Sequence, residues 1–183
     1  MGQYAHGNEP VHHVTSMYAL GGAKKEGEEI IHRVMDELYN SGPSGYCGDE
    51  DNGQMAAWYI WNSIGMYSMT PGTGEYVFGS PNVDSAFIKI QGKTCEIQVK
   101  KVKSNKVKEE KYKYIDKIFV NGNRWTKLFI THDIMAEGAK IEFVMSNEPK
   151  ERKLIDSDYP TTLTSMIDER GWFKSVDKLK LVA

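Results

Sequence analysis

The chain has 183 residues, of which 40% are hydrophobic and 26% are charged, a composition that is typical of globular proteins. Its formal net charge of −2 gives no overall basic field that would attract nucleic acid. The lysine-rich run at residues 100–113 is interrupted by Glu109 and Glu110, a pattern typical of the solvated side of a hairpin. No segment approaches the ~20 consecutive apolar residues of a membrane-spanning helix. We therefore expect no nucleic-acid partner and no membrane span.

The first part of the chain, up to residue 70, carries a helical pattern that glycine-rich turns interrupt. Pro10 is favoured in the first turn of a helix, and Asn8 or Glu9 can serve as the N-cap. This first helix is expected to end at the glycine pair 21–22. A second helix is expected at residues 26–39, where apolar residues form one stripe among charged ones.

A third helix is expected at about residues 54–67. Its sequence, QMAAWYIWNSIGMY, is apolar on nearly all sides, so most of its surface should be buried. This pattern indicates an inner helix of a larger helical barrel, and residues 1–70 then form the end of that barrel.

After Pro71-Gly72 the pattern changes to the alternation of β-strands, and residues 71–147 are expected to form an antiparallel sheet or sandwich. Asn121-Gly122 is a strong hairpin turn signal. Residues 148–183 form a weakly patterned tail, with a short helix expected at 165–176. The expected strands cover residues 75–78, 86–90, 95–99, a segment ending at 121–122, 125–130 and 140–145. The fold class is therefore α+β.

Two clusters of polar residues lie in turns that precede helices. The first is His6-Gly7-Asn8-Glu9-Pro10, and the second is Gly48-Asp49-Glu50-Asp51-Asn52-Gly53-Gln54. Consecutive carboxylates repel one another unless they face water, cap a helix or bind a cation. The second cluster therefore has two interpretations: Asp51 or Asn52 caps the third helix, or the turn is a calcium loop. The full EF-hand pattern is absent.

Together these clusters resemble glycoside hydrolase family 92. The matching text is HGNEPVHH at residues 6–13, GYCGDEDNGQMAAWYIWNSIGMYSMTPGTGEYVFGSP at 45–81 and THDIMAEGAKIEFVMS at 131–146. The resemblance covers about residues 3–147. It implies enzymes that remove terminal α-linked mannose with inversion at the anomeric carbon and that need Ca²⁺. It also implies that the helices are the last helices of an (α/α)₆ barrel, followed by β-structure.

The resemblance assigns roles to individual residues. Asp49 and Asp51 match the acidic pair on the base side of the site, with Asp51 favoured as the base or as the residue that holds the water. Asn8 and Glu9 match the segment that contributes to the calcium and sugar site, with Asp51 as a further calcium ligand. His6 and Glu9 are expected to contact the sugar.

The family's general acid is a glutamate in an upstream segment that has no counterpart before Met1. This difference indicates a C-terminal portion that is inactive alone, whose partners are mannose-containing glycans and the missing N-terminal part of the same enzyme. Family members act mostly in the periplasm, at the cell surface or as secreted proteins. Two alternatives are a carbohydrate-binding module that uses Tyr76, Trp125 or Trp172, and a scaffold that docks through Trp58 and Trp61.

Overall fold

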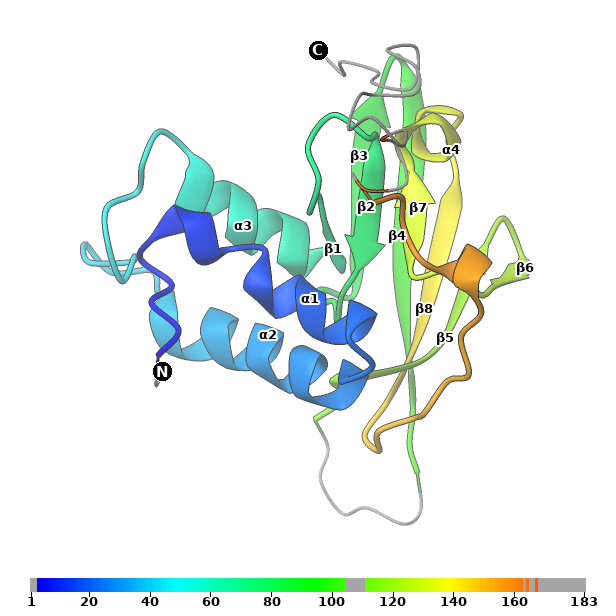
Figure 1. The fold of residues 1–183 in the computed structure, drawn as a ribbon, viewed down its shortest axis with the longest axis horizontal. Coiled ribbons are helices and arrows are strands. Elements are labelled where there is room, and N and C mark those ends of the chain that lie inside the picture. The colour runs from blue at the N-terminus through cyan, green and yellow to red at the C-terminus, as the bar shows by residue number, and fades with distance from the viewer. Residues whose placement is uncertain (1–2, 105–110, 163, 165–166, 168–183) are drawn as a thin grey trace.

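The computed structural model describes residues 3–104, 111–162, 164 and 167. Three of its helices lie side by side on one side of the molecule, and the strands lie on the other (Figure 1). The helices are η1 (Glu9–Val11), α1 (Val14–Leu20), α2 (Lys24–Leu38), α3 (Gln54–Ser63), α4 (His132–Ala136) and η2 (Asp156–Asp158). The strands are β1 (Met66–Tyr67), β2 (Glu75–Phe78), β3 (Ser85–Ile90), β4 (Lys93–Val102), β5 (Tyr114–Val120), β6 (Asn123–Trp125), β7 (Phe129–Thr131) and β8 (Lys140–Ser146).

The strands form two sheets, one of three strands in the order β1-β2-β7 and one of five in the order β3-β4-β8-β5-β6. The prediction of a purely antiparallel region was wrong in one place, because β4 and β8 pair in parallel. The predicted hairpin across residues 100–113 was also wrong, because β8 lies between β4 and β5. The hairpin predicted at Asn121-Gly122 does join β5 to β6, with both turn residues at positive φ.

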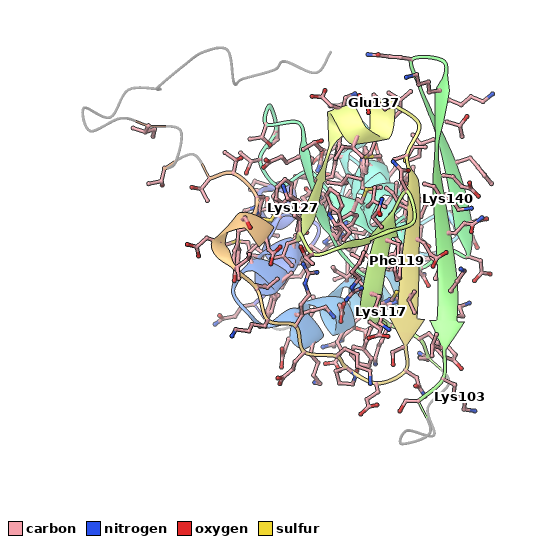
Figure 2. The ribbon with its side chains drawn as sticks, turned by 90° about the vertical axis from the view of Figure 1, so that its right-hand side faces the viewer. Lys103, Lys117, Phe119, Lys127, Glu137 and Lys140 are labelled. Atoms are coloured by element: carbon pink, nitrogen blue, oxygen red, sulfur yellow. The ribbon has the colours of Figure 1, made fainter. Side chains whose placement is uncertain are left out.

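One face of the five-stranded sheet forms the main core, and the other faces outward. Alternate residues of β8 are fully buried, among them Ile141 and Phe143, so the period of two decides which side chains enter the core. Figure 2 shows the outward face, with Lys117 and Phe119 on β5 and Lys140 on β8. Lysines on this face pair with carboxylates of neighbouring strands, as Lys100 does with Glu142 at 2.6 Å.

Several helix ends differ from the sequence prediction. Instead of one helix starting at Pro10, a 3-10 turn over Glu9–Val11 precedes α1, and Asn8 makes no side-chain cap. The third helix ends at Ser63, because Gly65 adopts φ 81° and turns the chain into β1. The predicted strand at 125–130 is divided between β6 and β7, which belong to different sheets.

The third helix is buried along one side, where Met55, Trp58, Asn62 and Ser63 lie. Trp58 is fully buried and packs in a second core with Ile31, Val34 and Met35 of α2. Ile60, on the opposite side of α3, is 58% exposed. The predicted docking role of Trp58 is therefore wrong, because its ring lies in the core.

No helix within the described ranges is both long and apolar enough to cross a membrane. The short helix predicted at 165–176 lies, apart from Ile167, outside the described residues. The boundaries at residues 70 and 147 stay predictions.

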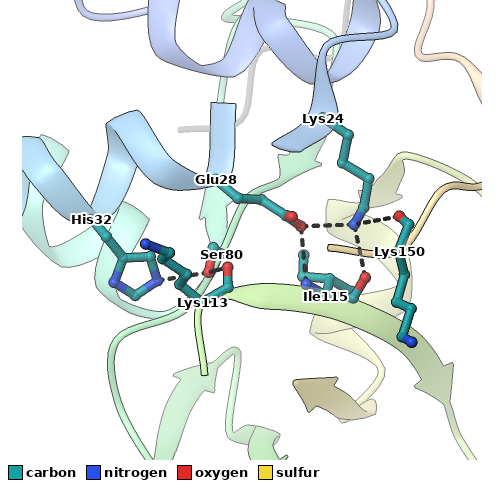
Figure 3. Close-up of polar contacts among 7 residues, drawn as sticks. All are labelled: Lys24, Glu28, His32, Ser80, Lys113, Ile115 and Lys150. Atoms are coloured by element: carbon teal, nitrogen blue, oxygen red, sulfur yellow. Dashed lines mark hydrogen bonds and ion pairs between the residues drawn. The ribbon is translucent and has the colours of Figure 1, made fainter. Parts of the chain in front are cut away.

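Polar contacts along one side of α2 join the helices to the sheet (Figure 3). Lys24 forms an ion pair of 2.9 Å with Glu28, and its ammonium group also donates to the carbonyl oxygen of Ile115 at 2.7 Å. The backbone N–H of Ile115 donates to Glu28 at 3.0 Å, so one β5 residue contacts both side chains. Burial raises the pKa of Glu28 to about 7 despite the neighbouring Lys24. We call Lys24, Glu28 and Ile115 the polar seam.

One helical turn further along α2, His32 extends the contact between helix and sheet (Figure 3). The fully buried Ser80 donates its hydroxyl proton to the carbonyl oxygen of Lys113 at 2.6 Å. The imidazole Nε2 of His32 lies 2.7 Å from the oxygen of the same hydroxyl, which can accept a hydrogen bond from the ring N–H. Burial lowers the pKa of His32 to about 4, so the ring is neutral at pH 7.

Replacing Lys24 by methionine should destabilise the chain by about 3 kcal/mol at pH 8, because the buried Glu28 carboxylate loses its cation. The deficit should shrink at lower pH. A glutamate whose folded-state pKa is raised stabilises the fold when protonated and loses that contribution as the pH rises through about 7. Urea unfolding at pH 6 and pH 8 measures both effects.

Lys25→Met is the matched control, because Lys25 and Glu29 form an i,i+4 pair on the same helix with both side chains more exposed. Its cost should stay within about 0.5 kcal/mol at either pH. Equal effects of the two substitutions would show that the polar seam contributes no more than a surface ion pair.

Candidate functional site

Two turns that are distant in sequence touch through their backbones. We call residues 6–9 the first turn and residues 48–53 the second turn. A Cβ atom placed on Gly7 would lie 3.0 Å from the carbonyl oxygen of Cys47, and one placed on Gly48 would lie 2.8 Å from the Cα atom of Gly7. Neither position leaves room for a side chain while the turns keep this separation, so the two glycines allow the turns to meet.

The contact brings the carboxylates of Glu9 and Asp51 together. The two carboxylates lie close enough to interact, and this interaction raises the pKa of Asp51. The pKa of Glu9 is lowered, first by a hydrogen bond from its own backbone N–H and then by Asp51. Asp49 lies near enough for its charge to oppose the lowering at Glu9. The structure therefore brings together three of the predicted site residues.

The second turn has an unusual backbone conformation. Asp51, Asn52 and Gly53 follow one another with φ values of 54°, 56° and 97°. Aspartate and asparagine tolerate this left-handed region better than most residues, but each still costs about 1–2 kcal/mol there. Contacts around the turn must offset that cost.

The predicted capping of the third helix by Asp51 or Asn52 was wrong. The residue that caps it is Glu50, whose carboxylate accepts from the backbone N–H of Gly53 at 2.5 Å and of Ala56 at 3.1 Å. Because Glu50 caps α3, the carboxylate of Asp51 remains available to face the first turn.

A buried polar network holds the first turn against α2 and α3. His6 is only 2% exposed, and its Nδ1 lies 2.8 Å from the hydroxyl of Tyr4. Its Nε2 lies 2.7 Å from the hydroxyl of Tyr39, which itself donates to the carbonyl oxygen of Met55 at 3.1 Å. His6 must therefore carry its proton on Nε2 and accept from Tyr4 at Nδ1. Burial, helped by His12, lowers the pKa of His6 to about 4 and keeps the ring neutral.

His12 continues this network to the third helix. Its Nε2 donates to the carbonyl oxygen of His6 at 2.9 Å, which leaves Nδ1 to accept from the Gln54 amide at 3.2 Å. The indole N–H of Trp58 donates to the carbonyl oxygen of His12 at 3.1 Å. The rings of His6 and His12 stack with their centroids 4.6 Å apart.

These contacts bear on the predicted role of His6. Both of its ring nitrogens are bonded to tyrosine hydroxyls, so neither is free for a sugar hydroxyl. The geometry thus favours a supporting role for His6 rather than the predicted sugar contact. Asn8 and Asp49, in contrast, are exposed beside the paired carboxylates.

The carboxylate oxygens of the site are the kind of ligand that a hard cation prefers. Oε1 of Glu9 is buried and has no hydrogen-bond partner, and the Asp51 carboxylate lies beside the same side chain. Within the described part of the chain, however, no three His, Cys, Asp or Glu side chains lie close enough to hold a metal ion. Calcium takes about six to eight oxygen ligands, so amide, backbone, water or sugar oxygens would have to complete its shell.

An open cleft of about 540 Å³ is lined by other residues than those of the two turns. It lies between α3 and the loop at residues 40–46, and aromatic rings of Tyr39, Tyr46 and Tyr59 line it. Tyr39 connects the cleft with the buried network, because its hydroxyl bonds His6 while its ring faces the cleft.

The aromatic residues proposed for a carbohydrate-binding module do not form an exposed platform. Trp125 packs against the main core, and its indole N–H donates to a backbone carbonyl at 2.9 Å. Tyr76 stacks on Trp61 with ring centroids 4.8 Å apart. Trp172 lies outside the described residues.

Sequence reasoning assigned no individual role to three residues that shape the site: Tyr39, Glu50 and Gln54. Tyr39 carries no local signal, because its partner His6 lies 33 residues away. The sequence could not identify Glu50 as the capping residue, because the neighbouring carboxylates are equally able to cap a helix. The only sequence signal for Gln54 was its position as the first residue of α3. A long polar side chain at that position can reach toward the preceding turn.

The sequence model of the glycosyl hydrolase family 92 catalytic domain matches residues 1–147. A protein of Arthroderma benhamiae, described as an uncharacterised secreted glycosidase, is 25% identical over 169 residues, which are 90% of this chain and 21% of that protein.

Solved structures show the same similarity to family 92 enzymes. A family GH92 α-mannosidase from Bacteroides thetaiotaomicron is similar with a TM-score of 0.79 and 33% identity, over 88% of this chain and 21% of that one. An inverting family GH92 mannosidase from the same species has a TM-score of 0.75 and 37% identity, over 87% and 21% of the two chains. The chain thus spans about a fifth of the length of these relatives, as 21% coverage shows.

Gly48→Ala should destabilise the chain by about 1–3 kcal/mol, because the new Cβ would lie 2.9 Å from the carbonyl oxygen of Gly7 and force the turns apart. Gly21→Ala is the control, since its Cβ would meet the carbonyl oxygen of Met17 at an ordinary 3.5 Å. That change should stay within about 0.5 kcal/mol in urea unfolding. A Gly48→Ala chain as stable as the control would show that this backbone contact does not constrain the turns.

Proposed function

Because the chain belongs to glycosyl hydrolase family 92, we propose that it takes part in an inverting, calcium-dependent hydrolysis of terminal α-linked mannose and supplies the base side of the site. The observation that carries this proposal is the meeting of Glu9 and Asp51 from two turns that lie 42 positions apart in sequence. Such a pair of acidic side chains suits both a cation and a polarised water molecule.

Inverting hydrolysis needs an acid at the leaving oxygen and a base that activates water on the opposite face of the sugar ring. Asp51 and Asp49 are our candidates for the base side, with Asp51 favoured. Glu50 is unsuitable as a base, since both of its carboxylate oxygens already accept backbone N–H groups. The unpartnered oxygen of Glu9 marks where a positive group or a hydroxyl donor would be accepted.

Asn8, Glu9 and Asp51 would hold the calcium ion, with Glu9 also placed to accept a sugar hydroxyl. When bound, the ion would hold mannose hydroxyls and favour distortion of the ring toward its transition state. The role of this chain's residues is to keep two carboxylates close enough to share a cation.

The remainder of the catalytic site would come from the rest of the protein. We propose that α1, α2 and α3 are the last helices of an (α/α)₆ barrel and that the general acid lies in a segment outside these 183 residues. Alone, the 183 residues should then release little or no mannose. The long relatives support this, since the chain covers only 21% of their length.

The substrates we propose are mannose-containing glycans. One of the Bacteroides mannosidases was solved in complex with mannoimidazole, which supports recognition of a mannose-shaped ring by this family. The secreted relative from Arthroderma supports a location outside the cytoplasm, in the periplasm, at the cell surface or secreted.

Asp51→Asn in the full-length protein should lower the rate of mannose release by about 10²–10⁴-fold, the range expected for loss of a general base. Asp36→Asn, an exposed position on α2, should leave the rate unchanged. Nuclear magnetic resonance of the first-formed sugar should show β-mannose from an α-mannoside. Full activity of Asp51→Asn, or first-formed α-mannose, would contradict the proposal.

Calcium should raise the thermal unfolding temperature of chelator-treated full-length protein, because an ion that binds only the folded state stabilises it by about 2.7 kcal/mol at a hundred times its Kd. Glu9→Gln should abolish most of this shift. Glu137→Gln, which alters an exposed carboxylate beside α4, should keep it. An equal calcium shift in both variants would place the ion elsewhere.

A further inference from the structure

Glu50 lies between the two candidate bases, yet its surroundings differ from theirs. Oε2 accepts from the backbone N–H of Gly53 at 2.5 Å, and Oε1 accepts from that of Ala56 at 3.1 Å. Both oxygens of this carboxylate are therefore directed at the start of α3, and the side chain has no oxygen turned toward the first turn.

Glu50 also satisfies most of the backbone donors with which α3 begins. The first bond between residues four apart in this helix runs from the N–H of Ala57 to Gly53. Of the four N–H groups from Gly53 to Ala56, three are bonded to Glu50, two to its carboxylate and that of Met55 to its carbonyl oxygen at 3.2 Å. A single residue thus replaces the missing preceding turn of the helix.

The hydrogen bond from Gly53 to Glu50 closes a loop over Asp51 and Asn52. These two residues and Gly53 have consecutive positive φ values, a conformation that the chain does not adopt without support. The backbone direction at Asp51 decides where its carboxylate points. In the observed turn the Asp51 carboxylate lies close enough to Glu9 of the first turn for the two groups to interact.

We propose that Glu50 is a positioning residue that fixes the second turn and thereby sets the Asp51 carboxylate against Glu9. This inference rests on the proposed function, because it concerns the geometry of that site. This role requires no contact between Glu50 and the sugar or the water. It acts through the backbone of residues 51–53, and its loss should affect the chemical step more than substrate binding.

Glu50→Ala and Glu50→Gln in the full-length protein test this role. Glu50→Ala should lower kcat by about 10²-fold, the effect expected of a misplaced catalytic group, with KM changed less than about threefold. Glu50→Gln should fall between wild type and Glu50→Ala, because its amide oxygen can accept one of the two N–H groups. Glu26→Gln removes an exposed first-turn carboxylate from α2 and should leave kcat unchanged.

A second pair of variants disturbs the turn without removing a charge. Gly53 and Gly22 both have positive φ, at 97° and 79°, and a Cβ atom on either would meet nothing within 4 Å. Gly53→Ala and Gly22→Ala therefore introduce a similar backbone strain, one in the second turn and one between α1 and α2. Gly53→Ala should lower kcat as Glu50→Ala does, and Gly22→Ala should not.

The outcomes separate this inference from the function on which it rests. If Asp51→Asn abolishes activity while folded Glu50→Ala and Gly53→Ala keep wild-type kcat, the positioning role is wrong and the proposed function stands. If Glu50→Ala does not fold, Gly53→Ala decides on the same criterion. If Asp51→Asn is fully active, the proposed function itself fails. A rise in KM without a fall in kcat would also overturn the positioning role.

Discussion

The backbone contact between Gly7 and Gly48 is the constraint on which the candidate site depends. It lets two turns approach so closely that the carboxylates of Glu9 and Asp51 interact. Any side chain at either glycine would meet backbone atoms, which cannot rotate away as a flexible side chain can. The chemistry proposed for Glu9 and Asp51 therefore requires glycine at both positions.

Each turn is then held by different physical means. The first turn rests on a buried network of neutral rings around His6 and His12, in which every donor has a defined acceptor. The second turn is held by a carboxylate, Glu50, at the start of a helix. The helix α2, which packs against α1 and α3, is joined to the sheet through the polar seam. A charged helix face thus connects the candidate site to the β-structure.

Local patterns predicted the elements better than their connections. The strand at β8 and the hairpin at Asn121-Gly122 could be predicted because alternation and turn chemistry depend on neighbouring residues. The parallel pairing of β4 with β8 could not, because about forty residues separate the two strands. At the site, Glu9 and Asp51 were predicted from a resemblance of motifs. The capping role of Glu50 was missed because local pattern cannot rank three adjacent carboxylates.

The place of β8 between β4 and β5 has a consequence for synthesis of the chain. β4 and β5 leave the ribosome first, and each then presents an unpaired edge where β8 will later insert. The sheet closes only when Lys140–Ser146 has emerged, so its assembly waits for a late segment. During that interval the unpaired edges of β4 and β5 can associate with strands of other chains, and chaperones would be expected to bind there.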